Sequence, residues 1–348
     1  MRLIQSVVLI LFVSIQTNAQ QPTIKVLESG KRVSIRGLSV VNDNIIWASG
    51  SSGSVARSTD GGNTFIWMKV PGYEKNDFRD IEAFDSNTAI IMGITAPAVI
   101  LKTKDGGKNW KKVFEDTTKG AFFDAMDFII EKDNNISGAV IGDPIDGKIF
   151  YALTFDAGEN WGKLPENKKS LLPDVSIGEA FFASSGTNIK ILDTKGFEPS
   201  LYSVSGGKSS NLWDMSYWKK YPLPIMQGRE STGANSLAIN ITNTKGIVVG
   251  GDFTKDTISS NNCVLLSFDK KVSMTLPQTP PHGYRSCVIY LDEKNLLTCG
   301  TSGIDISKDG GNNWELISKE SFHVCQKAKN GKAVFLAGGN GRIAKLVN

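Results

Sequence analysis

Charged side chains recur at corresponding places in this sequence, beside short apolar runs of the kind that form β-strands. Near the starts of such runs stand Arg36, Arg79, Asp124, Glu179, Arg285 and His323. After runs that end in glycine stand Asp143, Lys208 and Asp252. Arginine and lysine hold carboxylate groups through charge-assisted hydrogen bonds, whereas paired carboxyl groups transfer protons as general acid and base. These residue types therefore allow either the binding of an anionic ligand or the cleavage of an acidic sugar.

The two kinds of chemistry use different members of this set. The ligand-binding candidates are Arg36, Arg79, Lys208, Arg285 and His323. The catalytic candidates are Asp124, Asp143, Glu179 and Asp252. In either case the side chains must converge on one hollow, and the binding hypothesis requires this of Arg36, Arg79, Glu179 and Arg285 above all.

The register of the arginines leaves a structural alternative open. Arg36 and Arg79 occupy the same position in their runs, but Arg285 aligns one residue earlier, with Phe78. A shift of one residue sends a strand side chain to the opposite face. Ion pairs between neighbouring sheets are therefore a second use for such residues.

No cofactor or metal site is expected. The sequence has two histidines, and its four cysteines (Cys263, Cys287, Cys299 and Cys325) show no CxxC or His-paired spacing. A nucleophile turn of the form G-x-S-x-G and a dinucleotide loop of the form G-x-G-x-x-G are both lacking. A formal charge of +4 without a basic run gives no argument for nucleic acid. A disulfide between Cys287 and Cys299 and buried free thiols remain equally open.

A repeated unit positions these residues. An apolar run ending in glycine occurs seven times, at 47–50, 90–93, 139–142, 203–207, 247–251, 296–300 and 335–339. Each follows another strand-like run, which in the fourth copy is GEAFFA (178–183), and precedes a third, with a fourth after it in every copy but the last. Four antiparallel strands that recur roughly every 40 to 50 residues are typical of a β-propeller. The sequence therefore predicts an all-β fold, a seven-bladed β-propeller.

The phrase TKDGGKNW (103–110) has near copies at 58–65, 154–161 and 307–314, and a decayed copy at 267–274. A calcium loop would need further carboxylates at alternating positions, and a phosphate loop would need a Lys-Ser/Thr pair. Aspartate accepts hydrogen bonds from the amides of its own turn, and glycine tolerates a positive φ. We therefore expect the phrase to turn the chain between the third and fourth strands of a blade.

This phrase resembles the Asp box of bacterial sialidases and related propellers. With the glycine-ended strands, the whole chain after residue 19 resembles the photosystem II stability/assembly-factor-like branch of that superfamily, which includes many exported bacterial proteins. The resemblance implies the fold and leaves the activity open. It does not carry over sialidase catalytic residues, because the Phe/Tyr-Arg-Ile-Pro motif of those enzymes reads SIRGLS here, at 34–39.

Both ends of the chain carry information. The last unit stops at 341–348 without a fourth strand, and TIKVLES (23–29) precedes the first unit, so we expect 23–29 to complete the last blade and close the ring. Residues 1–19 have the basic start, apolar stretch and small-residue cleavage site of a secretory signal peptide. Their apolar stretch is too short for a membrane span. One propeller domain, 20–348, is thus expected in the periplasm or the extracellular medium.

The expected function is binding without catalysis. We predict an exported propeller that recognises a protein partner or an anionic ligand on one face. That face is formed by the starts of the first strands and by the loops between the second and third strands. The long polar loop at 163–179 is expected to cover it. The alternative is a carbohydrate-active enzyme, a glycosidase or lyase that acts on an acidic sugar.

Overall fold

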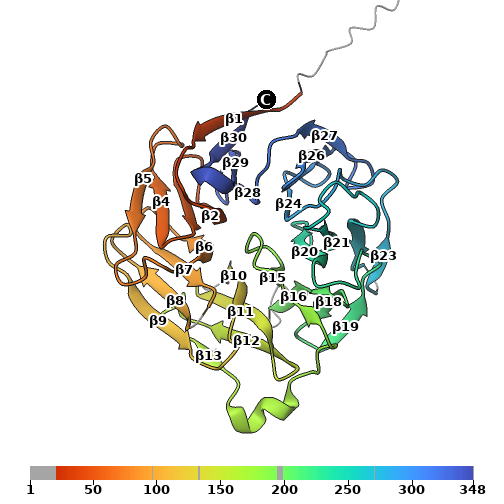
Figure 1. Ribbon diagram of the computed structural model, residues 1–348, viewed down its shortest axis with the longest axis horizontal. Coiled ribbons are helices and arrows are strands. Elements are labelled where there is room, and N and C mark those ends of the chain that lie inside the picture. Colours follow the sequence, from red (N-terminus) through yellow and green to blue (C-terminus); the bar gives the residue numbers. More distant parts are fainter. Residues whose placement is uncertain (1–20, 96, 132–133, 194–198, 270, 348) are drawn as a thin grey trace, which may run out of the picture.

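The computed structural model describes residues 21–95, 97–131, 134–193, 199–269 and 271–347. The expected signal peptide, 1–19, lies outside the described residues. The described strands form seven sheets arranged as the blades of a ring around a central axis (Figure 1). The first strand of each blade lies near the axis and the last lies at the rim. The predicted seven-bladed β-propeller is confirmed.

Blades one to three each contain four antiparallel strands in chain order. Blade one consists of β2 (Ile35–Val40), β3 (Ile46–Gly50), β4 (Ser54–Ser58) and β5 (Ile66–Lys69). Blade two consists of β6 (Phe78–Ala83), β7 (Ala89–Gly93), β8 (Ala98–Thr103) and β9 (Lys111–Asp116). Blade three consists of β10 (Phe123–Ile130), β11 (Ile136–Ile145), β12 (Lys148–Thr154) and β13 (Gly162–Lys163).

Blades five to seven repeat this arrangement. Blade five contains β20 (Thr232–Ile239), β21 (Lys245–Asp252), β22 (Cys263–Ser267) and β23 (Ser273–Thr275). Blade six contains β24 (Cys287–Tyr290), β25 (Leu296–Gly300), β26 (Gly303–Ser307) and β27 (Glu315–Ser318). Blade seven contains β28 (Val324–Lys327), β29 (Val334–Ala337), the 3₁₀ turn η2 (Gly339–Gly341), β30 (Ile343–Val347) and β1 (Thr23–Glu28). Strand β1 pairs antiparallel with β30, so the two ends of the described chain are held in one sheet (Figure 1).

Blade four departs from the sequence-based expectation. Its strands are β15 (Ile189–Leu192), β16 (Ser200–Val204), β18 (Asn211–Asp214) and β19 (Lys219–Pro222). The run GEAFFA, expected to be its first strand, instead begins with β14 (Glu179–Ala180), which pairs with β17 (Gly206–Gly207) and extends the sheet of blade five. The prediction for this strand was wrong, because a second strand-like run follows GEAFFA within ten residues.

The segment between β14 and β15, which we call the central loop (residues 181–188), reaches into the middle of the ring (Figure 1). The Ser185 hydroxyl donates to the backbone oxygen of Ser286 at 2.6 Å, and the Thr187 backbone oxygen accepts from the Leu237 amide at 2.8 Å. Gly186 has φ +66°, and a Cβ there would lie 2.3 Å from the carboxyl carbon of Asp80. The central loop is thus fastened to blades on both sides of the axis.

A β-bulge interrupts the start of the first strand in four blades. The register shifts occur between Ile35 and Gly37, Phe78 and Asp80, Phe123 and Ala125, and Ala234 and Ser236. The residue inside each bulge is respectively Arg36, Arg79, Asp124 and Asn235. A bulge leaves one residue unpaired and re-aims its side chain, and bulges are enriched beside functional sites.

The apolar core lies between neighbouring blades, because each sheet presents alternate side chains to the sheets on either side. Trp47 of blade one, for example, packs with Phe78 and Ile91 of blade two, and all three are fully buried. All four cysteines are buried free thiols. Cys287 and Cys299 lie opposite each other on β24 and β25 without a disulfide. The described residues include no helix of the length and apolarity that crossing a membrane requires.

The Asp-Gly-Gly phrases, and the Asp-Ala-Gly phrase at 156–158, form tight turns between the third and fourth strands, on the ring face opposite the first-strand starts. In the turn at 103–110, Asp105 accepts hydrogen bonds from the Thr103 hydroxyl at 2.9 Å and from the amide and side chain of Asn109 at 2.9 and 2.7 Å. These bonds, led by the Asn109 amide, lower the pKa of Asp105 to about 2. Asp60 and Asp156 make the same kind of contacts. The carboxylate of each aspartate is thus hydrogen-bonded within its own turn.

Candidate ligand-binding hollow

A hollow of about 440 Å³ opens at the end of the ring axis where the first strands begin. Its polar lining comprises Arg36, Arg79, Asp124, Asp143, Ser184, Asn235, Ser286, Thr301 and His323, and its aromatic lining comprises Phe122, Phe181, Phe182, Phe253 and Tyr284. Pockets of roughly 300–1,000 Å³ take small molecules or a few residues of a peptide. The volume therefore suits a compact ligand.

Six blades each contribute one side chain to this hollow from the same position. These are the four bulge residues Arg36, Arg79, Asp124 and Asn235, from blades one, two, three and five, with Ser286 and His323, from blades six and seven. The amides of Ser286 and His323 donate across to Cys299 and Ala337 just before the regular pairing of β24 and β28 begins. The repeat thus directs one residue per blade to a common point, and the central loop replaces the contribution of blade four.

Two arginines form the cationic side of the hollow. Arg36 donates from Nη1 to the backbone oxygen of Ser184 in the central loop at 3.1 Å. Burial, and next the charge of Arg79, lower the pKa of Arg36. Arg79 donates from Nε to Asp77 at 2.8 Å. A guanidinium has five N–H donors, so both groups retain donors for a ligand.

His323 lies beside the arginines as a neutral side chain. Its Nδ1 lies 2.9 Å from the backbone oxygen of Ile35, which can only accept, so Nδ1 carries the proton. Burial, followed by the charges of Arg36 and Arg79, lowers the pKa of His323 to about 4. The remaining ring nitrogen, Nε2, is therefore an acceptor at neutral pH.

Two carboxyl groups from blade three form the acidic side. Asp124 is fully buried, and neither of its carboxylate oxygens has a hydrogen-bond partner of ordinary geometry among the described residues. Burial and the neighbouring charge of Asp143 raise the pKa of Asp124 well above its usual value, while Arg79 and the Ala183 amide act weakly in the opposite direction. Asp143 accepts from the Phe181 amide at 3.0 Å, and burial raises the pKa of its carboxyl group as well.

Aromatic rings cover a third side. Phe253 follows β21 and packs edge-on against Phe182 of the central loop, with ring centroids 6.1 Å apart, and against Tyr284, at 6.3 Å. Phe253 remains 48% exposed, whereas Tyr284 is buried and donates from its hydroxyl to Asn235 at 2.8 Å. This side offers an apolar surface with a fixed shape.

Arg285 does not reach the hollow. It is fully buried and donates from Nε to Asp305 at 2.7 Å and from Nη1 to the Ser302 hydroxyl at 2.7 Å. Its alignment with Phe78, which is also fully buried, explains this position: the one-residue offset turns Arg285 away from the hollow and brings Ser286 to it. The expected ligand contact from Arg285 is corrected to a structural ion pair.

Three further candidates also lie outside the hollow. Glu179 is buried, and its carboxylate accepts from the side chains of Ser205, Asn211 and Trp213. Asp252 accepts from the amide and hydroxyl of Thr254 at 2.9 and 2.7 Å. The exposed Lys208 packs beside Gly178. Glu179 and Asp252 therefore hold local structure together. Of Arg36, Arg79, Glu179 and Arg285 only the first two line the hollow, so the predicted convergence of all four was wrong for Glu179 and Arg285.

Sequence reasoning missed the aromatic side and the central loop. Phe182 lies within the misassigned run GEAFFA, and Phe253 directly follows the candidate Asp252. Tyr284 directly precedes Arg285, and the offset that moves Arg285 out of the hollow moves its neighbours in. The one-residue offset of Arg285 in the alignment of the repeats could therefore have predicted that Tyr284 and Ser286 line the hollow.

No metal centre emerges from the described part of the chain, where groups of three or more His, Cys, Asp or Glu side chains with metal-binding geometry are lacking. Asp124 and Asp143 offer two carboxyl groups to a ligand, with the neutral His323 on another side of the hollow. The arrangement suits a ligand that combines an anionic, an apolar and a cationic part.

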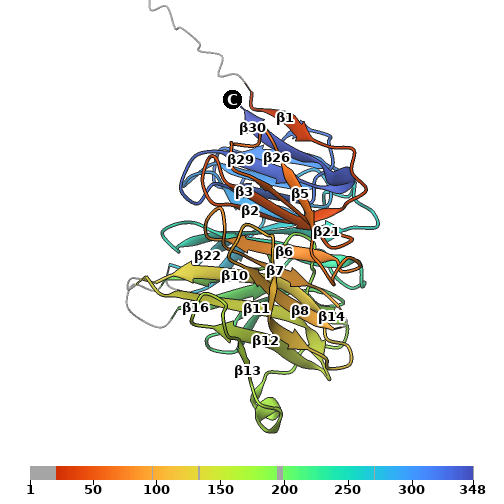
Figure 2. The same ribbon diagram turned by 90° about the vertical axis from the view of Figure 1, so that its left-hand side faces the viewer.

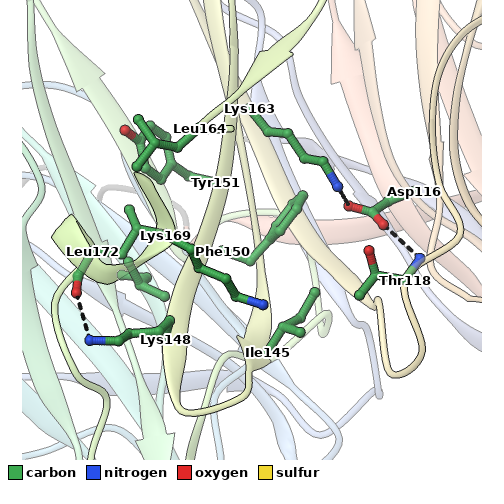
Figure 3. Close-up of a pocket in the computed structure, with 11 residues that line it drawn as sticks. Asp116, Thr118, Ile145, Lys148, Phe150, Tyr151, Lys163, Leu164, Lys169 and Leu172 are labelled. Atoms are coloured by element: carbon green, nitrogen blue, oxygen red, sulfur yellow. Dashed lines mark hydrogen bonds and ion pairs between the residues drawn. The ribbon is translucent and has the colours of Figure 1, made fainter. Parts of the chain in front are cut away.

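A second, smaller pocket of about 30 Å³ lies outside the ring, between blade three and the 3₁₀ helix η1 (Glu166–Leu171) (Figure 3). Its lysines are engaged: Lys163 pairs with Asp116 at 2.8 Å, and Lys148 donates to the backbone oxygen of Leu172 at 3.1 Å. The volume is that of about one water molecule. Helix η1 projects from the rim next to β13 (Figures 1 and 2), so the expectation that loop 163–179 covers the binding face is wrong.

The fold and the hollow define a seven-bladed β-propeller with a binding-sized cavity at one end of its axis. No family model and no curated protein sequence matches the chain. Solved structures that resemble it include YCF48 bound to a D1 peptide, with 15% identity, 96% of this chain and 98% of that chain covered, and a TM-score of 0.63. YCF48 from Cyanidioschyzon merolae (16% identity, 93% and 98% covered, TM-score 0.61) and U3-55K (12%, 93% and 98%, 0.61) are similar. At these identities the likeness shows the fold.

Proposed function

We propose that this chain is an exported propeller without catalytic activity that binds a peptide segment of a protein partner in the axial hollow. The observation that carries the proposal is the convergence of one side chain from each of six blades on a cavity of about 440 Å³. The similar propeller YCF48 has been captured with a D1 peptide, which supports a peptide as the kind of ligand.

The three sides of the hollow assign a role to each part of the peptide. Arg36 and Arg79 donate to a carboxylate, since arginine recognises this group through two parallel hydrogen bonds. Phe182, Phe253 and Tyr284 pack against an apolar or aromatic side chain. The bond from Arg36 to Ser184 holds its guanidinium in place before the ligand arrives, which lowers the entropy lost on binding.

The proposal includes the location and the lineage. The secretory pattern of residues 1–19 supports export to the periplasm or the extracellular medium. The hydrogen-bonded Asp turns at 58–65, 103–110, 154–161 and 307–314 support membership of the Asp-box superfamily. A fluorescent fusion to residues 1–19 would test export by its recovery outside the cytoplasm, and retention inside would contradict it.

A direct binding experiment tests the peptide function. The probe is N-acetyl-phenylalanyl-norleucine, which carries a ring and one carboxylate, compared with its amide, which lacks the charge. We expect the acid to bind at least tenfold more tightly, because a hydrogen bond to a charged group contributes about 1.5–3 kcal/mol. Arg36→Gln with Arg79→Gln should abolish the preference, and Lys112→Gln, on the outer strand β9, should keep it. Failure of wild-type protein to bind either probe would overturn the proposed function.

One observation favours a second candidate, an enzyme acting on an acidic sugar: the raised pKa values of Asp124 and Asp143 in a shared cavity suit an acid–base pair. Glu179 and Asp252 are not candidates for this pair, since the carboxylates of both accept hydrogen bonds outside the hollow. Incubation with polyuronate chains decides it. Release of reducing ends that Asp143→Asn abolishes would support the enzyme, and intact chains would exclude it for this substrate class.

A further inference from the structure

Asp124 occupies a position that the fold alone does not explain. Its side chain lines the hollow from the bulge in β10, is fully buried, and has both carboxylate oxygens without a hydrogen-bond partner of ordinary geometry among the described residues, where the Ala183 amide acts on it only weakly. An unpaired buried polar group destabilises a protein, and the great majority of buried polar atoms are paired. The bulge directs this side chain into the cavity despite that penalty.

Asp143 lies on the same side of the hollow and is only partly satisfied. One of its oxygens accepts from the Phe181 amide at 3.0 Å, and the other has no hydrogen bond to the described residues. The charged groups that face Asp124 are Asp143, which opposes its ionisation, and Arg79, which favours it less strongly. The hollow is thus lined by two carboxyl groups with three oxygens that lack a hydrogen bond of ordinary geometry to the described residues: two of Asp124 and one of Asp143.

We propose that Asp124 and Asp143 form a subsite for a primary ammonium group, so that the peptide bound in the hollow presents a lysine side chain close to its carboxylate. This inference rests on the proposed peptide-binding function. An ammonium group carries three N–H donors at tetrahedral angles, which matches the three unfilled oxygens. Arg36 and Arg79, which line the same hollow from blades one and two, remain available for the carboxylate.

Other cations fit the subsite less well. A divalent metal ion takes six or more oxygen ligands or a set of nitrogen and sulfur ligands, and the described residues provide no group of three metal-binding side chains. A guanidinium group is planar and spreads its five donors in a fork, whereas the acceptors here come from two neighbouring carboxyl groups. The ammonium group is compact and can approach both.

The pKa of Asp124 is raised in the protein without a ligand. Without a ligand, burial and Asp143 favour the protonated acid. An ammonium group beside Asp124 supplies a positive charge that stabilises the ionised form. Ligand binding should therefore convert the acid to the carboxylate. Binding of the lysine probe is therefore expected to strengthen as the pH rises and Asp124 loses its proton more easily.

Two dipeptides test the subsite by isothermal titration with the mature chain. N-acetyl-phenylalanyl-lysine carries the ring, the carboxylate and the ε-ammonium group, and N-acetyl-phenylalanyl-norleucine lacks only the ammonium. We expect wild-type protein to prefer the lysine probe at least tenfold. Asp124→Asn should reduce that preference to less than threefold. Asp269→Asn, at an exposed aspartate of the decayed turn, should change neither affinity.

The outcomes separate this inference from the proposed function. Equal binding of both dipeptides by wild-type protein overturns the ammonium subsite and leaves the peptide function intact. A preference for lysine that survives in Asp124→Asn overturns the assignment to Asp124. Binding of neither dipeptide overturns the subsite and the peptide function together. The wild-type comparison decides even if the variant folds poorly.

Discussion

Asp305 and Asp124 are equally buried and differently used. Asp305, on β26, accepts from Arg285 at 2.7 Å, lies 2.6 Å from Nδ1 of His282, and has no exposed surface. Asp124, on β10, has no exposed surface either and no hydrogen-bond partner of ordinary geometry among the described residues. The Asp305 carboxylate links β26 to the segment that carries His282 and Arg285, whereas the Asp124 carboxylate lines the hollow.

The difference shows how this propeller separates structure from function within one residue type. A buried carboxylate with a complete set of donors is a fixed part of the scaffold. A buried carboxylate without donors lowers stability and is kept where a ligand can supply them. The exposed Asp turns form a third class, in which the turn itself supplies every donor.

The largest expected effect is the loss of the Asp305 pair. Arg285→Met should lower the free energy of unfolding by about 3–5 kcal/mol, because it leaves a buried carboxylate without its arginine partner. Urea denaturation at pH 7 measures the change. The control is Lys112→Met, which removes a 43% exposed lysine paired with Glu115 and should cause no measurable loss. A loss of equal size in both variants would contradict the distinction.

Asp124→Asn should change the free energy of unfolding in the opposite direction. The amide has the shape of the acid without its charge, so the variant should be more stable than wild type by about 1–3 kcal/mol at pH 8. Because the pKa of Asp124 is raised in the folded state, its favourable contribution is complete below the pKa of the unfolded chain and is lost as the pH rises through the folded pKa. The two proteins should therefore converge as the pH falls below the ordinary aspartate pKa of 3.8. Reduced stability of the variant at pH 8 would show that Asp124 is structural.

A turn aspartate should give a smaller loss. Asp156→Ala removes bonds from the Thr154 hydroxyl and from the amide and side chain of Asn160, at 2.9, 3.0 and 2.8 Å. By comparison with a lost helix cap, about 0.5–2 kcal/mol should disappear at pH 7. The pKa of Asp156 is lowered to about 2, chiefly by the Asn160 amide, so its contribution should vanish as the pH falls from 4 toward 2. Acid titration of both proteins by circular dichroism checks this, and a gap that persists at pH 2 would argue against it.

The smallest effect at neutral pH concerns His323. With its pKa lowered to about 4, the ring is neutral at pH 7, and its contribution to stability is lost only as the pH falls below that of an ordinary histidine toward 4. Proton NMR can follow it directly, because the chain has only two histidines and His323→Gln identifies the signal. A midpoint near pH 6.5 would mean that burial and the two arginines do not act on the ring as described.

Much of the fold was accessible from the sequence because every blade repeats the same pattern. The seven glycine-ended runs predicted the seven sheets, and the same register predicted that Arg36 and Arg79 lie together. The first strand of blade four could not be predicted from the sequence. GEAFFA and the run at 189–192 both have strand-like patterns, and only tertiary contacts decide between them.

The site was accessible only in part. The sequence placed Asp124, Asp143 and His323 on the correct face, but it contained no direct information on which carboxylates would find donors. Glu179 receives its donors from Asn211 and Trp213, more than 30 residues away in the chain. Such pairing depends on long-range packing, whereas the offset of Arg285 was visible in the alignment of the repeats.

We propose, in short, that the hollow binds a peptide whose ammonium group replaces the proton of Asp124. The measurement is titration calorimetry with N-acetyl-phenylalanyl-lysine at several pH values between 4 and 8, in two buffers with different ionisation enthalpies. Wild-type protein should release a proton on binding, seen as a buffer-dependent enthalpy, and Asp124→Asn should not. Binding with the same enthalpy in both buffers would contradict the claim.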